Sequence, residues 1–363
     1  MIREMPNQTF MVSAPGAICL FGEEIAPLGL RTIHMAINMR VYIRAETVAE
    51  HIYRVEIPAE NRMDEFAPRD LAGRADAADP VRRAVCLLQR DGLEFGRGCR
   101  FEISTEIPPG IGLGYSAAVA VAWVTALLQL HDNLADSPAR RIARVACEAA
   151  ALDGANPVRM ADYLSSAAGG VNVIDPGNRF EMTPIPRALD GLIIVYAELE
   201  GRPGPDTRAA ADAIAEAGRR LREIDPTMDF AKTPTDDIIK LLKRLPDSLA
   251  AAAYAVAVDR DTTEKARDLL TQEVFDQDAF GEMFDSQHEM LRDHLGLAVP
   301  QIDRLIEVGK LGGALGGRLN LPTGRTATIY APGRTQPVLA ALREAGARPC
   351  VVTKTHGVAF EGV

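Results

Sequence analysis

The chain lacks the features that mark membrane-bound, secreted or nucleic-acid-binding proteins. No apolar run approaches the roughly 20 residues that a membrane span needs, and the opening stretch MIREMPNQTFMVSAPG has no apolar centre typical of a secretory signal. Its 40 Lys and Arg residues are outnumbered by 50 Asp and Glu, which gives a net charge of −10. A general nucleic-acid binder needs the opposite excess to displace counterions. We therefore expect a cytoplasmic protein with no membrane or nucleic-acid partner.

Cysteine and aromatic residues are also scarce. The five cysteines are widely spaced and form no Cys-x-x-Cys pair, which argues against a zinc site or a disulfide framework. We expect reduced thiols that are mostly buried. Trp123 is the only tryptophan and is expected to pack in the core. The remaining composition, 363 residues with 47% hydrophobic and 25% charged, is typical of a globular protein of about two domains.

The first half of the chain mixes strands and helices. Residues 10–20, 37–47 and 100–107 are β-rich or alternate apolar and polar residues, and they predict strands. A glycine-rich loop then runs into an apolar helix. The segment SPARRIARVACEAAALDG predicts another helix, with Ser137 as its cap and Gly154 at its end.

The second half is mostly helical. The candidate helices cover roughly 206–223, 235–257, 260–273 and 277–295. Strand-like segments are LIIVYAEL, TATIYA and CVVTKT, and the last two are separated by the helical QPVLAALREAG. The predicted secondary structure changes near residue 185 from mixed strands and helices to mostly helices. We therefore expect two domains, 1–185 and 186–363, of which the second is an α+β domain.

The strongest chemical signal is the loop PPGIGLGYSAA at residues 108–118. Glycines allow positive φ, and the loop delivers N–H groups and the positive end of the next helix to one point, which suits nucleotide phosphates. The loop is neither a Walker loop nor a Rossmann fingerprint, and an ordinary tight turn before a core helix is the alternative. The candidate nucleotide-binding residues are Pro108, Pro109, Gly110, Ile111, Gly112, Leu113, Gly114, Tyr115, Ser116 and Ala117.

This loop resembles the PxxxGLGSSAA nucleotide loop of the GHMP small-molecule kinases, which include galactokinases, mevalonate kinases and homoserine kinases. Three further stretches resemble family motifs in the same order: APGAICLFGEE, MADYLSSAAGG and SQHEMLRDHLGLAVPQIDRLIEVGKLGGALGGRLN. Their style is most similar to bacterial galactokinase-like sugar kinases. The resemblance covers most of the chain. It implies a two-domain α+β fold with an N-terminal ribosomal-S5-like β/α domain and a C-terminal ferredoxin-like α+β domain.

The resemblance also implies phosphoryl transfer from ATP, with Mg²⁺, to a hydroxyl of a small molecule, which we expect to be a sugar or sugar derivative. Asp162 lies at the position of the catalytic aspartate, where a carboxylate can orient or deprotonate the acceptor hydroxyl; a solvated Asp before a helix is the alternative. Ser116 corresponds to a serine that helps to hold Mg²⁺. Glu148 is the nearest acidic residue to the second Mg²⁺ ligand, with Asp153 as an alternative. Glu148 could equally be an ordinary polar helix residue.

For the acceptor, the resemblance points to the end of the first motif. Glu23 matches its acidic residue near the acceptor site, and Glu24 is its neighbour. His34 follows in a strand-like run and is a third candidate for lining the acceptor pocket.

Several positions depart from the family pattern. Ala17 replaces a Lys or Arg that orients the catalytic aspartate, and Ala26 replaces an Asp that accepts hydrogen bonds from sugar hydroxyls. Tyr115 replaces a loop serine. The stretch 321–326 keeps only one glycine of the last glycine run, and its Arg325 is either a compensating cation or a surface residue. Three functions stay open: a kinase for a sugar or sugar derivative, a pseudokinase that binds a nucleotide or metabolite as a regulator, and a kinase for a non-sugar alcohol. The oligomeric state is open too.

Overall fold

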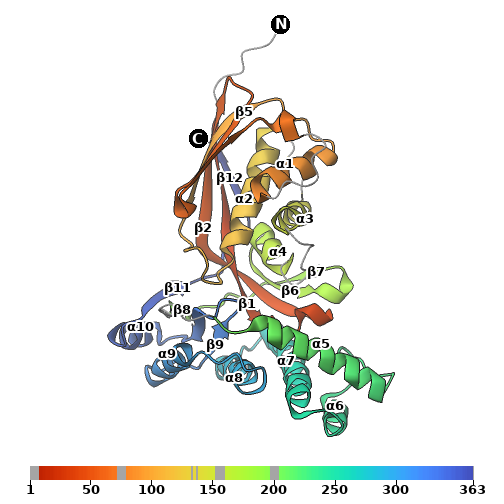
Figure 1. Cartoon of the computed structure of the whole chain (residues 1–363). Helices are drawn as coiled ribbons and strands as arrows, with labels where there is room; N and C mark the ends of the chain where they lie inside the picture. The colour runs from red at the N-terminus through yellow and green to blue at the C-terminus, as the bar shows by residue number, and fades with distance from the viewer. Residues whose placement is uncertain are drawn as a thin grey trace. The chain divides into compact units, whose positions relative to one another are not determined.

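A computed structural model of the chain describes residues 8–71, 79–131, 134–135, 138–151, 160–196 and 204–362 (Figure 1). They form two compact units. The first unit takes its residues from Met1–Ile18, Ala36–Gly170 and Lys354–Val363, and the second from Cys19–Met35 and Val171–Thr353. The units therefore interleave along the chain, whereas the predicted domains 1–185 and 186–363 assume a single boundary. Those domain ranges stay a proposal.

The first unit is built on a sheet with the strand order β12-β1-β2-β5-β3-β4. Its strands are β1 (Thr9–Phe21), β2 (Thr32–Val48), β3 (Tyr53–Ile57), β4 (Arg62–Phe66), β5 (Gly98–Thr105) and β12 (Ala359–Gly362). β5 runs antiparallel to β2 and parallel to β3. The three strands predicted for this half are confirmed, although β2 begins five residues earlier than its predicted start at 37.

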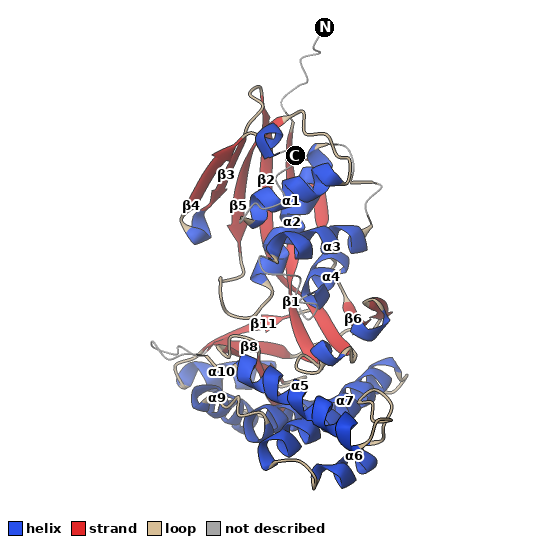
Figure 2. Ribbon diagram, turned by 45° about the vertical axis from the view of Figure 1, so that its right-hand side comes forward, coloured by secondary structure: helices blue, strands red, loops and turns tan. Residues whose placement is uncertain are grey.

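Four helices lie on the same side of this sheet, as both views show (Figures 1 and 2). They are α1 (Pro80–Arg90), α2 (Tyr115–Leu130), α3 (Ala139–Ala150) and α4 (Met160–Ala168). α2 is apolar around almost its whole circumference, and such a helix belongs inside a core. Trp123 of α2 is buried as predicted, and its indole N–H donates to the carbonyl oxygen of Val81 at 3.0 Å. The predicted caps Ser137 and Gly154 lie outside the described residues.

The second unit contains an antiparallel sheet with the order β11-β8-β10-β9. Its strands are β8 (Leu192–Tyr196), β9 (Gly316–Asn320), β10 (Thr326–Tyr330) and β11 (Arg348–Val352), and the helices packed with it include α8 (Gln277–Glu289), α9 (Pro300–Leu311) and α10 (Thr335–Glu344). A separate hairpin of β6 (Val171–Asp175) and β7 (Glu181–Ile185) pairs with the first residues of β2. A core cluster that includes Ile193, Ile302, Leu319 and Ile329 fills the space between this sheet and its helices.

The remaining helices of this unit correct one prediction. They are α5 (Thr207–Ile224), α6 (Thr235–Leu242) and α7 (Asp247–Thr271), and a π-helical turn, η6 (Met290–His294), extends α8. The predicted helices 235–257 and 260–273 placed the boundary between two helices at the wrong residues. The break lies at Pro246, which cannot continue a helix and instead precedes α7, so residues 258 and 259 lie inside one helix. No helix among these described residues or those of the first unit has the length and apolarity to cross a membrane.

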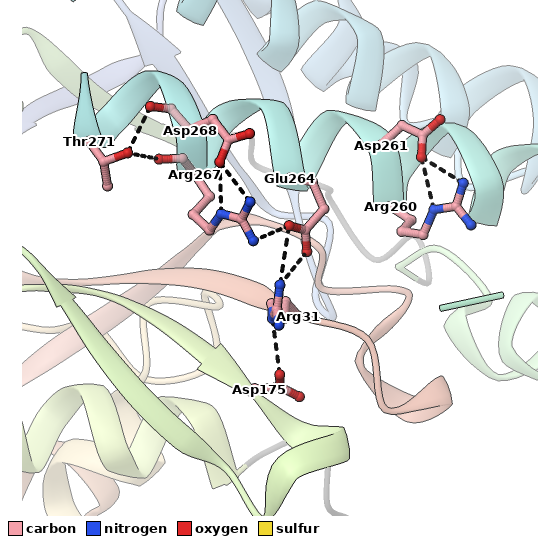
Figure 3. Close-up of polar contacts among 8 residues, drawn as sticks. All are labelled: Arg31, Asp175, Arg260, Asp261, Glu264, Arg267, Asp268 and Thr271. Carbon is pink, nitrogen blue, oxygen red and sulfur yellow. Dashed lines mark hydrogen bonds and ion pairs between the residues drawn. The ribbon is translucent and has the colours of Figure 1, made fainter. Parts of the chain in front are cut away.

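The short elements are the 3₁₀ turns η1 (Ala26–Leu28), η2 (Pro58–Glu60), η3 (Pro68–Leu71) and η5 (Pro176–Asn178). An ion-pair network joins the start of β2 to α7 (Figure 3). The Arg31 guanidinium lies 3.0 Å from an Asp175 carboxylate oxygen at the end of β6 and 3.3 Å from Glu264 of α7. Arg267 also pairs with Glu264. Because the side chains are partly exposed, each pair contributes only about 0–1 kcal/mol, and the network mainly fixes where these elements meet.

Candidate active site

The glycine-rich loop has the backbone that an anion cradle needs. Gly110, Gly112 and Gly114 have φ values of +75°, +83° and +72°, in the left-handed region that residues with a Cβ rarely adopt. α2 begins directly after Gly114, and no side chain caps its first turn. The N–H groups at this end of α2, with the positive end of the helix dipole, are therefore directed at the loop. Backbone N–H groups in this arrangement bind phosphate oxygens in many proteins, and the nucleotide-binding role of this loop stays a prediction.

The loop is docked on the first motif in β1. The Ala17 N–H donates to the carbonyl oxygen of Leu113 at 3.2 Å. A Cβ placed on Gly114 would lie 2.6 Å from the Ala17 nitrogen, and one on Gly16 would lie 2.5 Å from the Leu113 oxygen. Both glycines are thus required by close backbone approach, and two of the motifs found in the sequence are in direct contact.

The helix that carries Asp162 is fixed to the same part of β1. The Ser166 hydroxyl donates to the carbonyl oxygen of Pro15 at 2.7 Å, and both groups are buried. Asp162 lies four residues before Ser166, so the two side chains share one face of α4. α4 also packs against α2. The segment Pro15–Ala17 therefore contacts the glycine loop on one side and the Asp162 face of α4 on the other. Asp162 itself is half-buried.

A cavity of about 150 Å³ opens beside the start of α2. Most of its wall is apolar, and Ser116, Tyr115, Glu60 and Arg62 supply the polar groups. The apolar lining residues are Ile57, Pro80, Val81, Ala84, Ile103, Val119, Ala120, Trp123, Ala149 and Ala150. An apolar pocket with a few polar groups, next to an anion cradle, fits the base of a nucleotide whose phosphates lie on the loop.

Tyr115 forms part of this wall. Its hydroxyl donates to a carboxylate oxygen of Glu60 in η2 at 3.0 Å. Burial, followed by the negative charge of Glu60, raises the pKa of Tyr115 well above its usual value, so the phenol stays neutral. The residue that replaces the family serine thus adds a ring to the cavity wall.

The predicted metal ligands Ser116 and Glu148 differ in exposure and in their partners. Ser116 is exposed at the second position of α2, and its role as a metal ligand stays a prediction. The Glu148 carboxylate instead lies 3.1 Å from Arg144 and 3.5 Å from Arg90. Mg²⁺ would have to displace both guanidiniums, so the ligand role of Glu148 stays a prediction that these ion pairs oppose. Asp153, the alternative, lies outside the described residues.

Within the described part of the chain, no group of three or more His, Cys, Asp and Glu side chains is placed to hold a metal ion. A Mg²⁺ ion would enter with the nucleotide, whose phosphate oxygens supply most of its ligands.

The predicted acceptor residues belong to the second unit. A Glu23 carboxylate oxygen lies 3.2 Å from the Arg318 guanidinium of β9. The Glu24 side chain is only 8% exposed and lies 3.7 Å from the same guanidinium. His34 is buried in β2, opposite Asn172 of β6. Of the three, Glu23 is the most accessible, with 23% of its side chain exposed. The acceptor roles of Glu24 and His34 stay predictions, and their burial disfavours both.

Sequence reasoning missed the buried partner of Glu23, which is Arg318, and the polar side chains that surround this arginine. Arg318 is fully buried, and Asp259 of α7 and Gln287 of α8 are nearly so. The sequence feature that could have indicated this cluster is the single arginine, Arg318, in the otherwise uncharged stretch GALGGRLN. A charge at that place in a buried strand requires partners.

The departures from the family pattern are also visible. Ala17 and Ala26 are buried, with 2% and 5% of their surfaces exposed. Arg325 is exposed in the turn between β9 and β10, which fits the alternative of a surface residue.

Comparisons with known proteins agree with this geometry. Residues 79–170 match the profile of the GHMP kinases N terminal domain. The chain is 26% identical to the mevalonate kinase of Pyrococcus furiosus over 358 residues, which cover 94% of this chain and 95% of that protein. It is also 26% identical to a galactokinase of Haemophilus influenzae over 330 residues, covering 86% and 82%.

Solved structures show the same fold. The galactokinase of Lactococcus lactis complexed with galactose superposes with a TM-score of 0.78 at 18% identity, covering 98% of this chain and 95% of that one. The mevalonate kinase of Methanococcus jannaschii superposes with a TM-score of 0.69 at 18% identity, covering 95% and 98%. The predicted two-domain α+β fold is confirmed. Taken with the ordered motifs and the docked glycine loop, these matches confirm the predicted resemblance to the GHMP kinases, whose N-terminal domain profile matches residues 79–170.

Proposed function

We propose that the protein is a kinase that uses ATP and Mg²⁺ to phosphorylate a hydroxyl of a small molecule, and that a sugar or sugar derivative is its acceptor. One observation carries the proposal: the segment Pro15–Ala17 contacts both the phosphate-type loop, through Leu113, and the helix of Asp162, through Ser166. An anion cradle and a carboxylate fixed to one rigid strand are what phosphoryl transfer by positioning requires.

Each candidate site residue then has a role in this reaction. Bound ATP supplies the phosphoryl group, and Mg²⁺ neutralises part of its charge. The amides of the 112–116 backbone bind phosphate oxygens, and Ser116 offers its hydroxyl to the ion. The cavity beside Trp123 takes the base. Asp162 accepts a hydrogen bond from the attacking hydroxyl and orients it. Glu23, in the second unit, is the acceptor-site candidate that the first motif supplies.

The relatives suggest two classes of acceptor. The Lactococcus lactis galactokinase binds galactose, and a neutral polyol suits a site that contains the Glu23 carboxylate. The 26% identity to the Pyrococcus furiosus mevalonate kinase over almost the whole chain favours a second candidate, a hydroxy acid such as mevalonate. The loss of the family cation at Ala17 motivates the third, a pseudokinase that binds nucleotide without turnover. An ATP-dependent reaction fits the cytoplasmic location expected from the sequence.

The test combines binding and turnover. ATP with Mg²⁺ should raise the melting temperature of the full chain, because a ligand that binds only the native state stabilises it. ATP consumption is then measured with D-galactose, with a pool of other sugars and polyols, and with mevalonate. Asp162→Asn should abolish turnover and keep the thermal shift. Binding without turnover on any acceptor would support the pseudokinase, and the absence of binding would refute the nucleotide site.

A further inference from the structure

A buried guanidinium lies directly behind the proposed acceptor residue Glu23. Arg318 of β9 has none of its surface exposed. Its Nη1 atom donates to the carbonyl oxygen of Leu20 at 2.9 Å and to Oε1 of Gln287 at 3.0 Å, and its Nε atom donates to the carbonyl oxygen of Leu319 at 3.1 Å. Three neutral acceptors from three segments therefore fix the plane of the guanidinium independently of its carboxylate partners.

The remaining nitrogen of Arg318 is directed at the first motif. Nη2 donates to Oε2 of Glu23 at 3.2 Å and lies 3.7 Å from Oε1 of Glu24. The two carboxylates differ in access, because the Glu24 side chain is only 8% exposed and the Glu23 side chain is 23% exposed. A carboxylate has two oxygens and about four acceptor sites. Glu23 can therefore accept from Arg318 and from a ligand hydroxyl at the same time.

A third carboxyl group completes the buried cluster. Asp259 of α7 accepts a hydrogen bond from the Gln287 side chain, and Gln287 in turn accepts from Arg318. Burial, followed by the charge of Glu24, raises the pKa of Asp259 to about 8, so this group keeps its proton at pH 7. The Arg318 charge is then shared by two carboxylates rather than three, and Glu23 is the nearer of them.

We propose that Arg318 is a positioning residue that fixes the Glu23 carboxylate so that it can accept a hydrogen bond from a hydroxyl of the acceptor; the inference rests on the proposed kinase function. A planar guanidinium fixed by three other bonds restricts the rotamer of its carboxylate partner. A lysine in the same place keeps the charge but has no second nitrogen in a fixed plane, so it cannot set this orientation.

The test separates positioning from simple structural support. With ATP, Mg²⁺ and whichever of D-galactose, the sugar and polyol pool or mevalonate gives turnover, Glu23→Gln should raise the acceptor KM about tenfold and leave the ATP KM unchanged. Arg318→Lys should do the same. Because both act through one carboxylate, the double variant should be no worse than Glu23→Gln alone. Arg31→Lys is the matched control, since Arg31 lies in the same unit within a partly exposed ion pair (Figure 3), and it should leave both KM values unchanged.

Glu23→Asp covers the case in which Arg318→Lys fails to fold. It keeps the charge, withdraws the carboxylate from Arg318 by one methylene, and alters a side chain that is partly exposed; it should raise the acceptor KM selectively. Two results would overturn the positioning role. In the first, the double variant raises the acceptor KM by the product of the two single-variant effects. In the second, Arg318→Lys raises the acceptor KM and the ATP KM equally. A wild-type acceptor KM in Glu23→Gln would overturn the inference and leave the kinase proposal intact. No turnover on any acceptor would overturn both.

Discussion

The Ser166 hydroxyl donates a 2.7 Å hydrogen bond to the carbonyl oxygen of Pro15, and this contact fixes α4 to the strand on which the glycine loop is docked. The bond joins residues 151 positions apart in the sequence. It lies one helical turn from Asp162, so any movement of α4 against β1 also displaces the proposed catalytic carboxylate.

Ser166→Ala should therefore lower both stability and turnover. The variant leaves the buried Pro15 carbonyl without its hydroxyl partner, which costs about 1–3 kcal/mol of unfolding free energy. Turnover should fall more than nucleotide binding, because α4 carries Asp162 and the loop does not depend on this bond. Urea denaturation and the ATP-induced thermal shift measure the two effects.

Ser165→Ala is the matched control for this prediction. Its hydroxyl is also buried but has no hydrogen-bond partner among the described residues. Removing it should leave stability unchanged or raise it by up to about 1 kcal/mol. Equal losses in the two variants would contradict a specific role for the Ser166–Pro15 bond.

Gly114→Ala should damage the nucleotide loop more than Gly110→Ala. Both glycines have positive φ, so each alanine has a backbone cost of about 1–2 kcal/mol. Only at Gly114 would the new Cβ meet the backbone nitrogen of Ala17, at 2.6 Å, whereas nothing lies within 4 Å of a Cβ at Gly110. We expect Gly114→Ala to weaken ATP binding at least tenfold, which isothermal titration calorimetry would measure. Similar affinities in both variants would show that the docking on Ala17 is unimportant for the nucleotide.

Nucleotide binding should change the fluorescence of Trp123. This is the only tryptophan of the chain, and it lines the cavity beside Ser116. A base that enters the cavity contacts the indole or displaces water near it, so titration with ATP should give a saturable change in emission. Trp123→Phe, which should fold because both side chains are apolar and aromatic, should lose the signal. A thermal shift by ATP without any change in emission would place the base elsewhere.

The buried carboxyl group of Asp259 should make stability depend on pH. Its pKa is about 8 in the folded chain, against a usual value of 3.8. Between these values the folded chain holds a proton that the unfolded chain has lost, so the free energy of unfolding falls as pH rises, by at most about 1.4 kcal/mol per pH unit. The contribution is fully present below about pH 4 and is lost by about pH 8.

Asp259→Asn should remove this slope, because the amide imitates the protonated carboxyl group and cannot ionise. The charged groups that act on Asp259 are Glu24 and Arg318. Arg318 in turn faces Glu23, and it also acts on His288, which pairs with Asp303. Urea denaturation between pH 5 and pH 9 measures the slope. Asp268→Asn, at a position on α7 where 61% of the side chain is exposed, is the control and should keep the wild-type slope. Parallel slopes for wild type and Asp259→Asn would contradict the buried proton.

The sequence by itself determined the local features of this protein. The glycine loop, the apolar helix α2 and the strands β1, β2 and β5 were predicted because backbone freedom at glycine and the periodicity of apolar residues act over short distances. The order of the motifs was sufficient to indicate the superfamily and its fold. The error at Pro246 also had a local cause, since the proline itself marks the helix start.

Only the tertiary structure decided which side chains meet. No local pattern indicates that Leu113 contacts Ala17, that Ser166 bonds to Pro15, or that Glu148 is already paired with Arg90 and Arg144. The burial of Arg318 behind Glu23 is of the same kind. Such contacts join segments far apart in the chain, and they form because packing of the helices on the sheets brings those segments together and because each buried charge or carbonyl must find a partner there.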